Sequence, residues 1–145
     1  MEEGWVGPWV QNACFCENAI FDAQQVLTLV RVVDRVTVNP PAPGSSGVMI
    51  VPTLYLVVGL KAGDARGRGT VSIEAEGPDG LRRGESQPFS VLFESPDRGH
   101  AIVLQFQIPF QEEGLHWYTV RYEGRLLTRL PLRVIHEQPA RTGPR

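Results

Sequence analysis

The sequence predicts an all-β domain, built as a two-layer sandwich of about seven to eight antiparallel strands. Residues 70–76 alternate strictly between polar and apolar side chains, so one face of this segment belongs in a core and the other in water. The pattern recurs along most of the chain and is cut at short intervals by Gly, Pro and Asp, as at Pro78-Asp79-Gly80. No stretch has a convincing helical period, and short strands between turns are typical of a sandwich.

Two strands are expected in the first third of the chain. Residues 9–20 form the first, which ends at the turn signal Asp22-Ala23-Gln24-Gln25. Residues 26–38 form the second because they are rich in β-branched side chains, and Asp34-Arg35 within them predicts a bulge or a bend. Residues 39–47 are dense in Pro and Gly and predict a loop.

Four more strands are expected between this loop and the last two strands of the chain. The nearly continuous apolar residues 48–60 predict a central strand, although Pro52 places its first part at an edge or a bulge. The other three occupy residues 70–76, 87–94 and 100–110, each bounded by turn residues.

The last two strands are predicted to form a hairpin closed by the three-residue loop Tyr122-Glu123-Gly124, with Gly124 in the left-handed conformation. A two-residue turn at Glu123-Gly124 is disfavoured, because it would bring Thr119 and Arg121 to the side of Leu130. The three-residue loop instead gives a mostly apolar inner face, with these opposing pairs: His116 with Leu130, Tyr118 with Thr128, and Val120 with Leu126.

The outer face of this hairpin is the candidate interaction surface. The expected register pairs Trp117 with Arg129, Leu115 with Pro131, and Glu113 with Arg133. Trp and Arg are enriched in the hot spots of protein interfaces, so we expect Trp117, Leu115, Arg129, Pro131 and Arg133 to contact a partner. The alternative is that Trp117 covers the edge of the core, with Arg129 stacked on it as a local cation–π pair.

Several motifs occur together along the chain. They are Cys14-Phe15-Cys16-Glu17-Asn18-Ala19-Ile20, Leu27-Thr28-Leu29-Val30, Asp34-Arg35, Leu56-Val57-Val58-Gly59-Leu60, Pro78-Asp79-Gly80, and the stretch from Gly114 through Tyr118 and Gly124 to Pro131-Leu132-Arg133-Val134. Over most of its length the chain therefore resembles a family of small bacterial proteins of unknown function with an immunoglobulin-like β-sandwich. The resemblance implies the immunoglobulin-like version of the fold and brings no catalytic residues with it.

The length of the chain limits the number of domains, and its charge limits the classes of partner. The 145 residues fit one domain at residues 9–136, between a flexible lead at 1–8 and a disordered tail at 137–145. The net charge of −2 gives no bulk field that favours nucleic acid or an acidic membrane. The N-terminus lacks the pattern of a secretory signal, and no apolar run reaches the roughly 20 residues of a membrane helix. We expect a cytoplasmic protein that binds neither nucleic acid nor membrane.

No catalytic, metal or cofactor motif stands out, so we expect no cofactor and no metal. His116 and His136 lie about 20 Å apart on the predicted hairpin, too far to share a metal ion. Cys14 and Cys16 point to one face of a strand with nearly parallel side chains, which disfavours a disulfide. We expect both thiols to be free, as small buried hydrophobic groups of the first strand.

Three functions remain, in order of preference. The first is a non-enzymatic protein-interaction or accessory module, which captures a protein partner or self-associates through a sheet face or edge. The second is a small-ligand or carbohydrate-binding sandwich with an aromatic platform such as Trp117 or Tyr55. The third, well behind, is an enzyme whose catalytic triad is assembled from separate strands.

Overall fold

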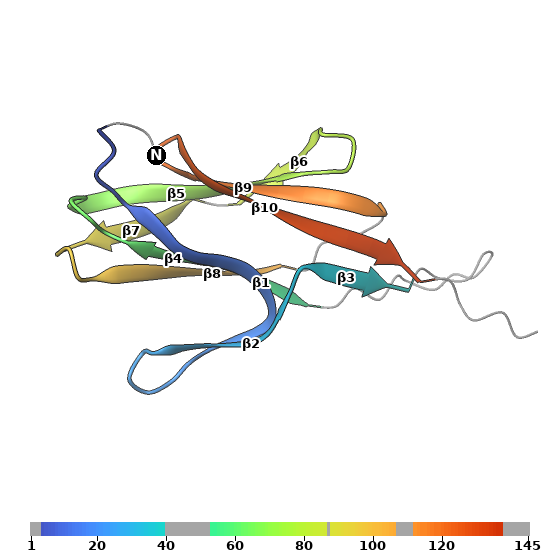
Figure 1. Ribbon diagram of the computed structural model, residues 1–145, viewed down its shortest axis with the longest axis horizontal. Coiled ribbons are helices and arrows are strands. Elements are labelled where there is room, and N and C mark those ends of the chain that lie inside the picture. The colour runs from blue at the N-terminus through green and yellow to red at the C-terminus, as the bar shows by residue number, and fades with distance from the viewer. Residues whose placement is uncertain (1–3, 40–52, 87, 107–111, 138–145) are drawn as a thin grey trace, which may run out of the picture.

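The computed structural model describes residues 4–39, 53–86, 88–106 and 112–137, which form two β-sheets packed face to face (Figure 1). The first sheet has the strand order β2-β1-β4-β8: β1 (Trp9–Phe21), β2 (Leu27–Val33), β4 (Leu54–Lys61) and β8 (Gly99–Phe106). The second has the order β3-β10-β9-β5-β6, with β7 also paired to β5: β3 (Arg35–Val38), β5 (Gly67–Glu76), β6 (Arg82–Glu85), β7 (Phe89–Phe93), β9 (Gly114–Tyr122) and β10 (Arg125–His136).

The strand order is that of an immunoglobulin-like sandwich. Strands β1, β4 and β8 form one layer and β5, β9 and β10 the other, and the chain crosses between layers from β4 to β5 and from β8 to β9. This alternation matches the immunoglobulin strands A, B, E and C, F, G. The predicted fold class is therefore confirmed, and β2 is an additional strand at the edge of the first sheet.

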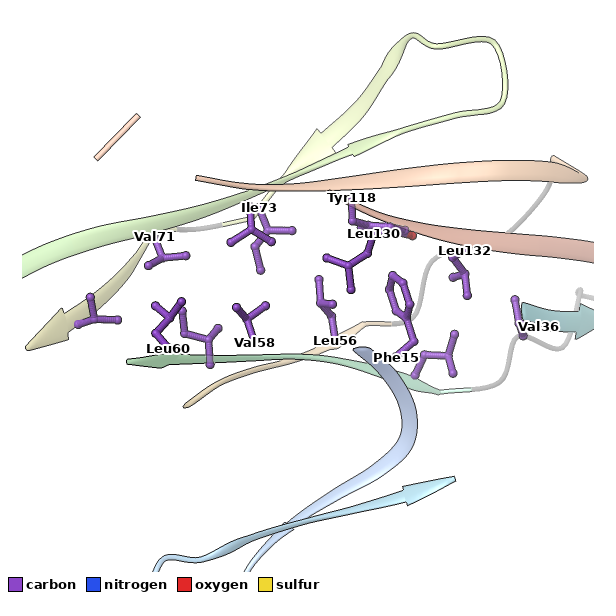
Figure 2. Close-up of a cluster of buried hydrophobic side chains, with 14 of the residues drawn as sticks. Phe15, Val36, Leu56, Val58, Leu60, Val71, Ile73, Tyr118, Leu130 and Leu132 are labelled. Carbon is purple, nitrogen blue, oxygen red and sulfur yellow. The ribbon is translucent and has the colours of Figure 1, made fainter. Parts of the chain in front are cut away.

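The core lies between the two layers (Figure 2). Leu56, Val58 and Leu60 of β4 point across it, because alternate side chains of a strand share one face. The aromatic rings of Phe15 and Tyr118 meet edge to face across the core, with their centroids 5.2 Å apart. The contact joins β1 of the first sheet to β9 of the second.

The prediction of one strand over residues 26–38 is wrong. The segment forms β2 and β3, which belong to different sheets and are separated by Asp34. The bend expected at Asp34-Arg35 is present, and beyond it the chain crosses to the second sheet, where β3 lies parallel to β10. There Val36 and Val38 join the core.

The predicted register of the last hairpin is also wrong, and the predicted inner face is right except at Leu126, which pairs with Arg121 and is 51% exposed. The turn has two residues, Glu123 and Gly124, with φ angles of 48° and 80°, as the type I′ turn requires. The register then shifts between Leu126 and Thr128, so Leu127 is an extra residue in β10. Relative to the predicted register, the two-residue turn shifts the pairing by one residue and the bulge shifts it by one more. From Thr128 onward the total shift of two residues leaves each side chain on its predicted face. The observed pairs are Leu130 with Tyr118, Thr128 with Val120, Leu132 with His116, Pro131 with Trp117, and Arg133 with Leu115.

The remaining boundaries differ from expectation in smaller ways. Arg82–Glu85 forms the short strand β6, and the strand expected at 87–94 is reduced to β7. The expected strand residues 48–52 and 107–110 lie outside the described residues, as does the tail from residue 138 onward. Part of the lead expected to be flexible packs on the domain, since Asp64 N donates to Val6 O at 2.8 Å.

Candidate functional site

The outer face of the second sheet carries the five residues proposed from the sequence as an interaction surface. We call this set the terminal-hairpin face: Leu115, Trp117, Arg129, Pro131 and Arg133. The residues come from the neighbouring strands β9 and β10, and alternation points them away from the core because Tyr118, Leu130 and Leu132 point into it. The structure therefore places all five on one face.

Trp117 is the centre of a fixed contact network on this face. It lies between Glu76 of β5 and Pro131 of β10, and its side chain is half-buried rather than exposed. The guanidinium carbon of Arg129 lies 4.6 Å from the centroid of the indole ring. Arg129 Nη2 also donates to Glu76 Oε2 at 2.8 Å, and its Nε donates to Thr119 Oγ1 at 3.3 Å. The local cation–π pair considered in the sequence analysis is thus present, through a diagonal contact between the strands.

Arg133 has the opposite character. It is exposed, and within the described residues it forms no ion pair. Its neighbours in the ladder are Leu115 on one side and Arg35 on the other. Arg35 pairs with Asp34 at 3.0 Å. This end of the face therefore has apolar surface beside an uncompensated cation.

A second surface was missed in the sequence analysis: the first hairpin, formed by residues 17–33 of β1 and β2. Its end projects from the body of the sandwich (Figure 1). Five of the nine exposed large hydrophobic residues within the described part of the chain belong to it: Ile20, Phe21, Val26, Val30 and Val32. Val26 and Val32 are 56% and 61% exposed. The signal was available in the sequence, since residues 26–33 are apolar at both odd and even positions, so both faces of the strand are apolar.

A cleft of about 980 Å³ lies between the first hairpin and strands β4 and β8. Its wall on the hairpin side includes the apolar Phe21, Val26 and Leu29 together with the polar Gln25. Its other wall includes the cation Lys61 together with His100. The cleft thus combines apolar surface with polar side chains that could orient a small molecule.

The two cysteines are free, and they lie on the part of β1 that pairs with β4, just before the first hairpin. Cys16 is fully buried and Cys14 is half-buried. Burial raises the pKa of both thiols, and the neighbouring Cys14 raises that of Cys16 further. A raised pKa leaves less of the nucleophilic thiolate at neutral pH.

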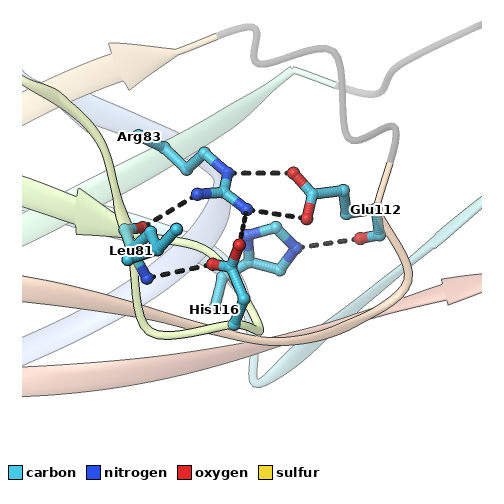
Figure 3. A network of polar contacts seen from close by, with 5 residues as sticks. Leu81, Arg83, Glu112 and His116 are labelled. Atoms are coloured by element: carbon cyan, nitrogen blue, oxygen red, sulfur yellow. Dashed lines mark hydrogen bonds and ion pairs between the residues drawn. The ribbon is translucent and has the colours of Figure 1, made fainter.

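A polar cluster fastens the start of β9 to the turn before β6 (Figure 3). Arg83 donates to both carboxylate oxygens of Glu112, at 2.9 and 2.8 Å, and forms an ion pair with Asp79 at 2.8 Å. These hydrogen bonds lower the pKa of Glu112 and of Asp79. His116 Nε2 lies 2.9 Å from the carbonyl oxygen of Glu112, to which it can donate. The cluster uses its polar groups to hold the chain in place.

The three histidines are distributed over the molecule. His100 lies on β8, His116 on β9 and His136 at the end of β10. Over residues 4–39, 53–86, 88–106 and 112–137, no three His, Cys, Asp or Glu side chains gather as a metal site would require. The same residues contain no helix long and apolar enough to cross a membrane.

Comparisons with known proteins give a family and a set of distant structural likenesses, among them the following two. The sequence profile of a family of unknown function, DUF6941, matches residues 11–135. The chain is similar to an immunoglobulin-like protein from Pseudomonas aeruginosa, with 14% identity and a TM-score of 0.45 over 88% of this chain and 96% of that one. It is also similar to the alkylpurine DNA glycosylase AlkC of Pseudomonas fluorescens, solved on DNA with an abasic site analogue. That likeness has 11% identity and a TM-score of 0.45, over 70% of this chain and 28% of the glycosylase. No curated protein matches the sequence.

Proposed function

The chain belongs to the DUF6941 family of unknown function, and from its surface we propose that it is a non-enzymatic protein-interaction module. The observation that carries the proposal is the composition of the terminal-hairpin face, where Trp117, Leu115 and Pro131 lie beside Arg129 and Arg133. Aromatic and arginine side chains are enriched in interface hot spots, while most other surface residues contribute little.

The partner is a protein surface that offers a carboxylate group to this face. Arg133 stands next to Arg35 without an anion of its own, and a carboxylate placed there would form a charge-assisted hydrogen bond. Leu115 beside it supplies the apolar contact. Trp117 and Arg129 form a preordered centre, since their geometry is already fixed by Glu76 and Thr119. A preordered centre loses little conformational freedom on binding.

A non-catalytic role is supported by the state of the potentially reactive side chains. The Cys14 and Cys16 thiols have raised pKa values, which suits packing rather than nucleophilic attack. His116 is 8% exposed and holds the backbone of Glu112. These three side chains have structural roles, and none of them forms an accessible pair of nucleophile and general base.

The alternative is a small-ligand or carbohydrate-binding sandwich, and its support comes from the cleft under the first hairpin. The ring of Trp117 is covered by Arg129, so that residue is poorly placed as a sugar platform. The cleft offers Phe21 and Leu29 for an apolar ligand body and Lys61 for an anionic group. A ligand bound there would raise the melting temperature of the protein without any partner.

The test is capture of partners from native lysate on immobilised protein, followed by mass spectrometry. Arg133→Glu is the main variant, because it reverses an exposed charge that forms no ion pair within the described residues. Trp117→Ala is the second, and should weaken capture by roughly 2 kcal/mol. Leu81→Ala, on the turn before β6, is the control because it removes an exposed hydrophobic side chain that does not belong to the terminal-hairpin face.

We expect a protein that binds the parent chain and the Leu81→Ala variant to be lost with Arg133→Glu. Circular dichroism checks that each variant keeps its β-rich fold. Equal recovery of every partner by Arg133→Glu and the parent would reject the terminal-hairpin face as the binding surface. Loss with Trp117→Ala alone, accompanied by unfolding, would assign Trp117 to the core.

A further inference from the structure

The sheet edges of this molecule are protected to very different degrees. In the second sheet the edge strands β3, β6 and β7 have only four or five residues each, and β3 and β6 carry arginine. Short, charged edges are the usual means by which proteins avoid pairing with other chains. The first sheet has two longer edge strands. Strand β8 has eight residues, and those from His100 to Leu104 are buried or half-buried. Strand β2 has seven residues, Leu-Thr-Leu-Val-Arg-Val-Val, with one charge and with Val30 and Val32 exposed.

The single charge on β2 is already neutralised. Arg31 Nε lies 2.6 Å from Glu17 Oε2 on the neighbouring strand β1. Arg31 also has a φ of 53°, which ends the regular part of the edge and leaves Leu27–Val30 as an extended segment. This segment is electrically neutral, contains no proline and is rich in residues that favour strands.

The outer edge of β2 is accessible. Strand β2 pairs with β1 on one side, and no other described strand pairs with it. The first hairpin projects from the body of the sandwich, with β2 on its outer side (Figure 1). The exposed side chains of Val26, Val30 and Val32 surround it.

We propose that the edge of β2 pairs antiparallel with β2 of a second copy of this chain, which joins two first sheets into one continuous sheet. The proposal concerns a different surface from the terminal-hairpin face and does not depend on it.

The identity of the occupant follows from the sequence of the edge. A twofold axis through Leu29 sets Leu29 opposite its own copy and Thr28 opposite Val30. Apolar and β-branched pairs of this kind stabilise neighbouring strands. No like charges face each other in this register, because the only charged residue, Arg31, lies opposite Leu27. The edge is thus complementary to itself, as a twofold interface requires.

The test measures the oligomeric state of the full chain by analytical ultracentrifugation over micromolar to millimolar concentrations. We expect a reversible monomer–dimer equilibrium for the parent chain. Val30→Lys should raise the dimer dissociation constant by about tenfold or more, since twofold symmetry introduces the charge twice. Leu81→Lys is the matched control, because it places the same charge at an exposed hydrophobic position on another part of the surface. It should leave the dissociation constant unchanged.

Hydrogen exchange supplies an independent measurement. Backbone amides of residues 27–30 that point away from β1 should exchange more slowly as the protein concentration rises, and should not do so in Val30→Lys. A parent chain that stays monomeric throughout would overturn the proposal. So would a dimer that resists Val30→Lys but is lost with Arg133→Glu, which would place self-association on the terminal-hairpin face instead.

Discussion

The two hairpins of this protein contain similar proportions of apolar residues and have opposite positions in the fold. The terminal hairpin, β9 and β10, lies inside the second sheet, with β5 on one side and β3 covering part of the other. The first hairpin lies at the end of the first sheet and projects from the body. Val134 on β10 is fully buried, whereas Val32 on β2 is 61% exposed.

This difference separates two uses of hydrophobic residues. In the terminal hairpin the buried residues Leu130, Leu132 and Val134 occur at alternate positions of β10, and Arg129 and Arg133 lie on the opposite face. In the first hairpin apolar side chains occur at both parities, and the sandwich covers only the part near Cys16. Such a surface is costly to leave in water, and in β2 it coincides with an unpaired edge.

The largest expected effect comes from replacing one valine by alanine in each of the two hairpins. Val134→Ala should reduce the free energy of unfolding by about 2–3 kcal/mol, since it removes two buried methyl groups and leaves a cavity. Val32→Ala should change it by less than about 0.5 kcal/mol. Urea denaturation at low protein concentration measures both, which keeps any association of β2 from contributing.

Comparable losses at the two positions would mean that the first hairpin is packed against the body in solution. The comparison between the hairpins would then be wrong, and so would the accessibility of the β2 edge. A loss confined to Val134→Ala is the outcome that supports both.

The faces of the terminal hairpin were predictable from sequence, whereas its pairs were not. Alternation assigns Leu130, Leu132 and Val134 to one face whatever the register, because each side chain changes face with the next residue. The pairs depend on the turn type and on the bulge at Leu127, which has no strong local signal. Two errors of one residue cancelled, so Trp117 was placed on the correct face but opposite the wrong neighbour.

The division of residues 26–38 depended on a long-range contact. Composition identified the strand and Asp34-Arg35 marked the bend, but parallel pairing of β3 with β10 joins residues nearly 100 positions apart in the chain. Nothing local specifies such a contact. For the same reason the sequence could not show that β2 is an edge, although the apolar residues at both odd and even positions of 26–33 already indicated an apolar surface on each face.

The two hairpin turns offer a second comparison, with effects of opposite sign. Gly124 has a φ of 80° and a side chain there would be strained, so Gly124→Ala should destabilise the protein by about 1–2 kcal/mol. In the turn of the first hairpin Gln25 has a φ of 64°. Gln25→Gly relieves a similar strain at the cost of backbone entropy, and should stabilise the protein by no more than about 1 kcal/mol.

Thermal unfolding followed by circular dichroism measures both changes, with Gln24→Gly as a control at the neighbouring position of the first turn. A destabilising Gln25→Gly would show that the strain at this residue is compensated by contacts in the turn. The first hairpin would then be more firmly ordered than its exposure suggests.

The smallest effect concerns the polar cluster that holds the start of the terminal hairpin. The hydrogen bonds from Arg83 lower the pKa of Glu112 and, with a further bond from the Leu81 amide, that of Asp79. A carboxyl group whose pKa is lower in the folded state contributes stability above its unfolded pKa of about 4, and this contribution is lost as the pH falls through the folded value.

Because the carboxyl groups of Glu112 and Asp79 are exposed, their contribution to stability is small. The unfolding midpoint of the parent chain should therefore fall slightly more than that of Arg83→Gln between pH 5 and about pH 3, while Arg31→Gln, which removes the ion pair of the first hairpin, should follow the parent. Parallel curves for the parent and Arg83→Gln would mean that the cluster contributes nothing to the stability of the terminal hairpin.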